Sequence, residues 1–156
     1  MYKVLFVCHG NICRSPMAEF LFKYYVAKNG LSDLFYVESC ATSYEEIGNP
    51  VHYGTRKILD KYHIDYSKKR ARRITKADYD NFDYILAMDD NNIYNLKRIL
   101  GDDKLNKIHL LLEYTQEFRN IRDPWYTGNF KETEEDIING IKGFLNYILN
   151  IEEKSY

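Results

Sequence analysis

Cys8 and Arg14 are separated by five residues near the start of the chain, and a hydroxyl residue, Ser15, follows directly. A cysteine thiolate is a strong nucleophile, and a guanidinium binds the oxygens of a tetrahedral anion with two parallel hydrogen bonds. This spacing places a nucleophile and an oxyanion clamp at opposite ends of one tight loop. Ser15 can donate a hydrogen bond to the sulfur when the sulfur later leaves. The combination is suited to attack on the phosphorus of a phosphate ester.

The residues around this pair favour a loop that wraps an anion. An apolar run at residues 4–7 predicts a strand that ends at Cys8. Gly10 and Asn11 tolerate the backbone conformations that turn successive N–H groups inward, and Pro16 suits the first turn of a following helix. The positive end of that helix favours both a bound phosphate and a Cys8 thiolate. A buried cysteine beside an unrelated arginine is the alternative, and the other matching residue types make such a coincidence improbable.

A departing phenolate or alkoxide needs a proton, and Asp123 is the candidate donor. Pro124 fixes the backbone just after it, in a segment between the fourth predicted strand and the last predicted helix. By itself an Asp-Pro pair most often marks a simple turn. The proposed role of Asp123 therefore depends on the first motif.

The segment from Val7 to Glu19 resembles the N-terminal signature of the low-molecular-weight protein tyrosine phosphatases, with His9 at its variable position. That signature reads Val-Cys-x-Gly-Asn-Ile-Cys-Arg-Ser-Pro-Met-Ala-Glu. Further similar segments are Glu38-Ser39, Asp83 to Asp89 with Asn92, and Asp123-Pro124-Trp125-Tyr126. The resemblance covers nearly the whole sequence in the right order.

The resemblance implies hydrolysis of phosphotyrosine in proteins through a phosphocysteine intermediate. Cys8 would be the nucleophile, Arg14 the phosphate clamp and Asp123 the general acid and base. No cofactor or metal is implied, and none of the four histidines has a spacing to cysteine or carboxylate that suggests a metal site.

The resemblance also assigns residues that contact the substrate. Around the phosphate these are Gly10, Asn11, Ile12, Cys13 and Ser15. Tyr44, Trp125 and Tyr126 would wall a deep slot, which selects phosphotyrosine because a shorter phosphoserine would leave its phosphate above the nucleophile. Ser39 and His63 would support Asn11 by hydrogen bonds. Residues 68–70 are Lys-Lys-Arg where the family keeps a second histidine, so we expect a rearranged network there.

Cys13 lies on the same loop as Cys8, close enough in sequence for the two sulfurs to meet. We predict a reversible disulfide between Cys8 and Cys13 that protects the nucleophile from over-oxidation. Cys40 is interpreted as a small buried hydrophobic residue.

Apolar runs at residues 4–7, 35–37, 84–88 and 108–112 alternate with segments of helical spacing. Short continuous apolar runs predict strands buried on both faces. We therefore expect one three-layer α/β domain over residues 1–156, with a four-stranded parallel sheet, helices on both faces and the phosphate-binding loop after the first strand. In such a sheet, ligands bind at the carboxyl ends of the strands.

The overall composition limits which partners and which cellular location we expect for the protein. A net charge of −1 gives no general attraction to nucleic acid or membranes. Three cysteines and no signal or spanning segment predict a cytoplasmic protein, although secretion without a signal peptide stays open. We expect a monomer or weak self-association. The basic run at residues 68–73 is interpreted as a solvated loop rather than a nucleic-acid site, with a possible effect on the choice of acidic phosphopeptides.

Other classes of protein share part of this loop and are alternative predictions. An arsenate reductase of the same fold needs a downstream cysteine pair, whereas only Cys40 follows Cys13. A protein arginine phosphatase has threonine where this chain has Ile12, so isoleucine points toward phosphotyrosine. A phosphocysteine carrier of a sugar transport system would not require Asp123, and a pure anion-binding module would need no nucleophile.

Overall fold

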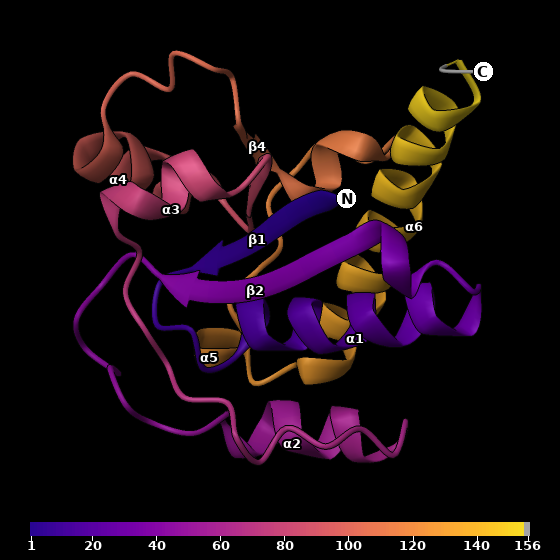
Figure 1. Ribbon diagram of the computed structural model, residues 1–156. Coiled ribbons are helices and arrows are strands. Elements are labelled where there is room, and N and C mark those ends of the chain that lie inside the picture. The colour runs from indigo at the N-terminus through magenta and orange to yellow at the C-terminus, as the bar shows by residue number, and fades with distance from the viewer. Residues whose placement is uncertain (155–156) are drawn as a thin grey trace.

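Four parallel strands form one sheet in the order β2-β1-β3-β4 in the computed structural model, which describes residues 1–154 (Figure 1). The strands are β1 (Tyr2–Cys8), β2 (Phe35–Ala41), β3 (Tyr84–Ala87) and β4 (Ile108–Leu110). Val4 to Cys8 of β1 is buried throughout, as expected for a central strand covered on both faces. The predicted four-stranded parallel sheet is confirmed.

Helices cover both faces of this sheet. They are α1 (Arg14–Lys28), α2 (Tyr53–Asp60), α3 (Lys76–Asn81), α4 (Asp90–Leu100), α5 (Pro124–Thr127) and α6 (Phe130–Lys154). One apolar core joins α1, α2 and α6 to the sheet, and a second core joins α3 and α4 to the opposite face. In Figure 1, α1 and α6 accordingly lie on the other side of the strands from α3 and α4. Within residues 1–154, no helix is both long and apolar enough to cross a membrane.

The fourth strand is shorter than its apolar run. The run at residues 108–112 predicts one strand, but β4 ends at Leu110 and the chain turns into a 3-10 helix, η2 (Leu111–Tyr114). A second 3-10 turn, η1 (Ser32–Leu34), precedes β2. The turn at η2 packs against α6 at Gly140, where an added Cβ would lie 2.5 Å from Leu111 Cγ. The missing side chain of Gly140 is what allows this close approach.

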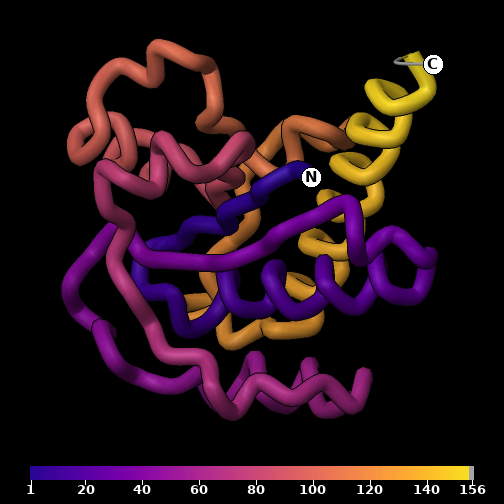
Figure 2. Tube along the Cα trace, viewed as in Figure 1, coloured from indigo at the N-terminus to yellow at the C-terminus, as the bar shows by residue number. Residues whose placement is uncertain are grey.

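Two long segments, after β2 and before α3, run side by side past the end of the sheet toward α2 (Figure 2). Gly48 N donates to the Ala71 carbonyl at 2.8 Å, and Ala71 N donates to the Asn49 carbonyl at 2.9 Å. The second segment contains the basic run, in which Lys68 and Arg70 are exposed as a solvated loop predicts, whereas the other residues are partly or fully buried. Ala71 is buried, and Arg72 forms ion pairs with Asp78 and Glu38. These pairs bind the run to the fold.

Candidate active site

Cys8 is the last residue of β1, and the loop that follows curls around its sulfur. Asn11 N and Ser15 N donate to Cys8 Sγ at 3.3 and 3.4 Å, and Ser15 Oγ lies 3.0 Å from the sulfur. Asn11 has a left-handed backbone with φ 59°, which asparagine tolerates better than most residues. The loop leads into α1, so the positive end of that helix faces the same point.

Gly10 serves a different purpose from the one that the sequence suggested. It does not have positive φ. A Cβ at Gly10 would lie 3.3 Å from Glu46 Cγ, so the glycine instead gives Glu46 room to lie over the loop.

Arg14 begins α1 and is 2% exposed. Its Nη1 donates to Asp89 Oδ2 at 2.7 Å and to the Ile121 carbonyl at 2.8 Å, and its Nη2 donates to Asp123 Oδ2 at 3.4 Å. Burial lowers the pKa of Arg14, but the negative charges of Cys8, Asp89 and Asp123 outweigh it and hold the pKa above its ordinary value. The guanidinium is therefore a fixed cation.

Asp123 precedes α5 and caps its first turn. Its Oδ1 accepts a hydrogen bond from Trp125 N at 3.0 Å, while Oδ2 faces Arg14. The side chain of Asp123 is 24% exposed and lines the cavity described below. Pro124 at the start of α5 fixes the backbone that holds it.

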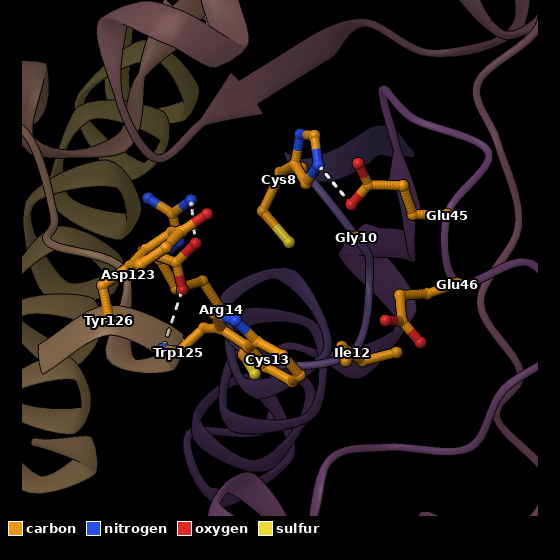
Figure 3. A pocket seen from close by; sticks show the side chains of 11 residues that line it. Cys8, Gly10, Ile12, Cys13, Arg14, Glu45, Glu46, Asp123, Trp125 and Tyr126 are labelled. Carbon is orange, nitrogen blue, oxygen red and sulfur yellow. Dashed lines mark hydrogen bonds and ion pairs between the residues drawn. The ribbon is translucent and has the colours of Figure 1, made fainter. Parts of the chain in front are cut away.

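A cavity of about 110 Å³ opens onto these groups (Figure 3). Its lining consists of Cys8, His9, Gly10, Ile12, Cys13, Arg14, Glu45, Glu46, Asp123, Trp125 and Tyr126. Trp125 and Tyr126 form part of one wall, where the sequence placed them. Tyr44 does not line the cavity, and its expected role in the slot is corrected. Its ring lies 4.1 Å from the Arg73 guanidinium and is 70% exposed.

Asn11 is held by a buried network behind the loop. Its Nδ2 donates to Ser15 Oγ at 2.8 Å and to Ser39 Oγ at 2.9 Å, and its Oδ1 accepts from Arg72 N at 3.1 Å. Ser39 Oγ in turn donates to Glu19 Oε1 at 2.6 Å. Ser39 thus lies where the sequence analysis placed it.

His63 does not join this network, which corrects its expected role. It is exposed just after α2, with a left-handed φ of 56°. Lys69 lies there instead, since its Nζ donates to the Ser39 carbonyl at 2.8 Å and lies 3.6 Å from Glu19 Oε1. Burial lowers the pKa of Lys69, although Glu19 acts in the opposite direction.

Sequence reasoning missed several of these residues. Glu19 follows Ser15 by four residues on α1, and that spacing is the signal that puts both on one helix face. Asp89 caps α4 by accepting from Asn92 N at 2.7 Å, and its second oxygen holds Arg14. An acidic cap directly after a strand was the available signal. Glu45 and Glu46 carry no such local pattern.

The three cysteines have different surroundings. Cys13 is 5% exposed and lines the cavity together with Cys8, and burial raises its pKa. Cys40 is fully buried in the core of the opposite face. All three are free thiols.

The fold and the site define a parallel α/β protein with a cysteine and an anion-binding type of loop at the end of its first strand. The sequence model described as "Low molecular weight phosphotyrosine protein phosphatase" matches residues 3–154. The chain belongs to this family, and it is a hydrolase of phosphoric monoesters.

Individual relatives agree with this assignment. Low molecular weight protein-tyrosine-phosphatase YfkJ of Bacillus subtilis is 42% identical over 93% of this chain and 94% of that protein. Its crystal structure matches with a TM-score of 0.92 over 96% of each chain. A low molecular weight phosphotyrosine protein phosphatase of Gallus gallus is 43% identical over 91% of this chain and 92% of its own. The structure of a Drosophila arginine phosphatase is 32% identical, with a TM-score of 0.84 over 94% of this chain and 97% of that one.

Proposed function

We propose that this enzyme hydrolyses phosphotyrosine in proteins through a phosphocysteine intermediate and needs no metal ion. The observation that supports this most strongly is the surroundings of Cys8 Sγ. Two backbone N–H groups and the Ser15 hydroxyl lie within 3.4 Å of the sulfur. Arg14 and Asp123 open onto the same cavity.

In the first step the Cys8 thiolate attacks phosphorus, so that an S–P bond forms as the bond between phosphorus and the tyrosyl oxygen breaks. Arg14 and the loop N–H groups hold the equatorial oxygens, where charge develops. Asp123 donates its proton to the departing tyrosyl oxygen. The hydrogen bonds from Arg14 to Asp89 and to the Ile121 carbonyl fix the position of the guanidinium before the substrate binds.

In the second step a water molecule attacks the phosphocysteine. Asp123, now a carboxylate, accepts a proton from the water, and the S–P bond breaks to release inorganic phosphate. Ser15 donates a hydrogen bond to the leaving sulfur, from which its hydroxyl oxygen is 3.0 Å away.

The cavity walls favour an aromatic phosphoester. Trp125 and Tyr126 on one side and Ile12 on the loop give apolar surface for a phenyl ring. The likeness to the Drosophila arginine phosphatase makes phosphoarginine the second candidate substrate. Ile12 contributes apolar surface where a protein arginine phosphatase has threonine, so we place phosphotyrosine first.

Steady-state hydrolysis in EDTA, with phosphotyrosine, phosphoserine and phosphoarginine as substrates, tests the proposal. Turnover confined to phosphotyrosine and abolished by Cys8→Ser supports it. Faster turnover of phosphoarginine would establish the second candidate. Folded protein without turnover of any of the three would contradict the hydrolytic mechanism and favour phosphate transfer or binding alone.

A further inference from the structure

One wall of the catalytic cavity is acidic. Glu45 and Glu46 lie across the cavity from Asp123 and Tyr126, with Cys8 between the two sides (Figure 3). The Cβ and Cγ atoms of Glu46 lie beside Gly10, and the Glu46 side chain lines the cavity. Any peptide whose phosphotyrosine enters the cavity must therefore pass these two side chains.

The two carboxylates lack a permanent cationic partner. Glu46 Oε2 accepts a hydrogen bond from Asn49 Nδ2 at 2.6 Å, which is a neutral donor. Among residues 1–154, no ion pair includes Glu46. Glu45 Oε2 lies 2.9 Å from His9 Nε2, and His9 is a cation only when protonated. Glu45 remains 69% exposed.

The arginines of the neighbouring run form no ion pair with this wall among the described residues. Arg72 is paired with Asp78 and Glu38, and the Arg73 guanidinium lies over the Tyr44 ring at 4.1 Å and donates to the Thr42 carbonyl. Arg14 is buried at the floor of the cavity. The entrance therefore presents excess negative charge to the part of a substrate that stays outside.

We propose that Glu45 and Glu46 select phosphotyrosine flanked by Lys or Arg and reject phosphotyrosine flanked by acidic residues. The inference rests on the proposed function, because it describes the substrates of the same site. A cationic neighbour of the phosphotyrosine is attracted to the two carboxylates, whereas an acidic neighbour is repelled. Exposed charges interact weakly, so the expected preference is roughly three- to tenfold in kcat/KM. The preference is opposite to the one for acidic phosphopeptides that the basic run suggested.

Two phosphopeptides that differ only in their flanking residues, Lys in one and Glu in the other, test this together with free phosphotyrosine. The wild-type enzyme should favour the Lys peptide at low ionic strength. The preference should nearly vanish at about 1 M salt, where the Debye length is about 3 Å. Because the readout is a ratio within one enzyme, a general loss of rate does not imitate it.

Replacing both Glu45→Gln and Glu46→Gln should bring the ratio to within about twofold of unity, and Glu46→Lys should invert it. Glu153→Gln removes the same charge from an exposed position in the last turn of α6 and should keep the wild-type ratio. A wild-type enzyme with no preference or an acidic one, or a double variant that keeps the preference, would overturn the proposal. Absence of turnover on free phosphotyrosine would instead overturn the proposed function, and the inference with it.

Discussion

The directions of the hydrogen bonds behind the nucleophile follow from one buried carboxylate. Glu19 is 5% exposed and, when ionised, only accepts, so Ser39 donates to it. Ser39 Oγ then accepts from Asn11 Nδ2, and the same amide donates to Ser15 Oγ. The Ser15 hydroxyl can then donate to the Cys8 sulfur, 3.0 Å away, or to the Cys40 carbonyl at 3.4 Å. The chain of hydrogen bonds that begins at Glu19 thus ends at a hydroxyl group in contact with the Cys8 sulfur.

Lys69→Met tests this argument, because it keeps the length of the side chain and removes the cation beside Glu19. We expect kcat on phosphotyrosine to fall roughly tenfold, with KM within about twofold, because support of about 1–2 kcal/mol is lost behind the loop and not at the substrate. Lys69→Arg should retain most of the activity. Lys68→Met, at the exposed neighbouring position, is the matched control. An unchanged kcat in Lys69→Met would show that Lys69 only helps the protein to fold.

Cys13→Ser tests the predicted disulfide. Peroxide oxidises the Cys8 thiolate to a sulfenic acid, and attack by the Cys13 thiol forms the S–S bond and releases water. Dithiothreitol should therefore restore wild-type activity after peroxide treatment. In Cys13→Ser, active beforehand, the sulfenic acid is oxidised further by sustained peroxide to the irreversible sulfinic acid, so dithiothreitol should not restore activity. Cys40→Ala should behave like the wild type because Cys40 lies in the opposite core. Full recovery of Cys13→Ser would refute the disulfide.

At the scale of elements, the sequence predicts those helices and strands whose formation depends on a short-range pattern of residues. The continuous run at residues 4–7 identifies the central strand because a strand covered on both faces needs apolar residues at every position. The end of β4 is not predictable in this way. Leu111 and Leu112 continue its apolar run, and only contact with α6 turns them into a 3-10 helix.

The residues of the candidate site also differ in how well local sequence predicts their positions. Cys8, Arg14 and Ser15 belong to one loop, so their type and spacing alone place them together. The positions of the Tyr44 and His63 side chains instead depend on contacts between segments that are far apart in the sequence. Arg73 holds the Tyr44 ring outside the cavity, and Lys69 lies next to Ser39 where His63 was expected. Neither contact leaves a local signal in the sequence.

Asp78→Asn should weaken the attachment of the basic run to the start of α3. Asp78 accepts from Arg72 Nη1 at 2.9 Å and from Thr75 N at 2.7 Å. Burial raises the pKa of Asp78, but the hydrogen bonds from Arg72 and Thr75 outweigh it, so the pKa lies below its ordinary value. We expect the free energy of unfolding at pH 7 to fall by about 1–3 kcal/mol.

The pH dependence of this loss has a definite sign. The unfolded chain protonates Asp78 near pH 3.9, before the folded protein does, so the stabilisation is complete above that pH and disappears as pH falls through the lower, folded pKa. Urea unfolding at several pH values should show the gap between wild type and Asp78→Asn narrowing below about pH 4. Asp80→Asn, exposed on the same helix, should cost little at any pH. A gap that is independent of pH would contradict the assignment.

At the scale of the whole molecule, Arg14 joins segments that are far apart in the chain. It begins α1, and it binds the residue that caps α4, the Ile121 carbonyl and the residue that caps α5. Cys8 at the carboxyl end of β1 lines the same cavity as Arg14 and Asp123. The group that we propose to hold phosphate thus also links the parts of the fold that surround the cavity.

Arg14→Met should therefore lower stability as well as activity. The buried guanidinium is lost while Asp89 and Asp123 remain, and removing one partner of a buried ion pair typically costs about 3–5 kcal/mol. Inorganic phosphate at about 100 times its Kd should stabilise the wild type by about 2.7 kcal/mol and the variant hardly at all. Urea unfolding with and without phosphate measures both effects. Arg122→Met removes an arginine whose side chain is 68% exposed and should change the free energy of unfolding by about 1 kcal/mol or less. If Arg14→Met is inactive yet as stable as the wild type, the ties to Asp89 and Ile121 serve only to orient the guanidinium, and the fold does not depend on them.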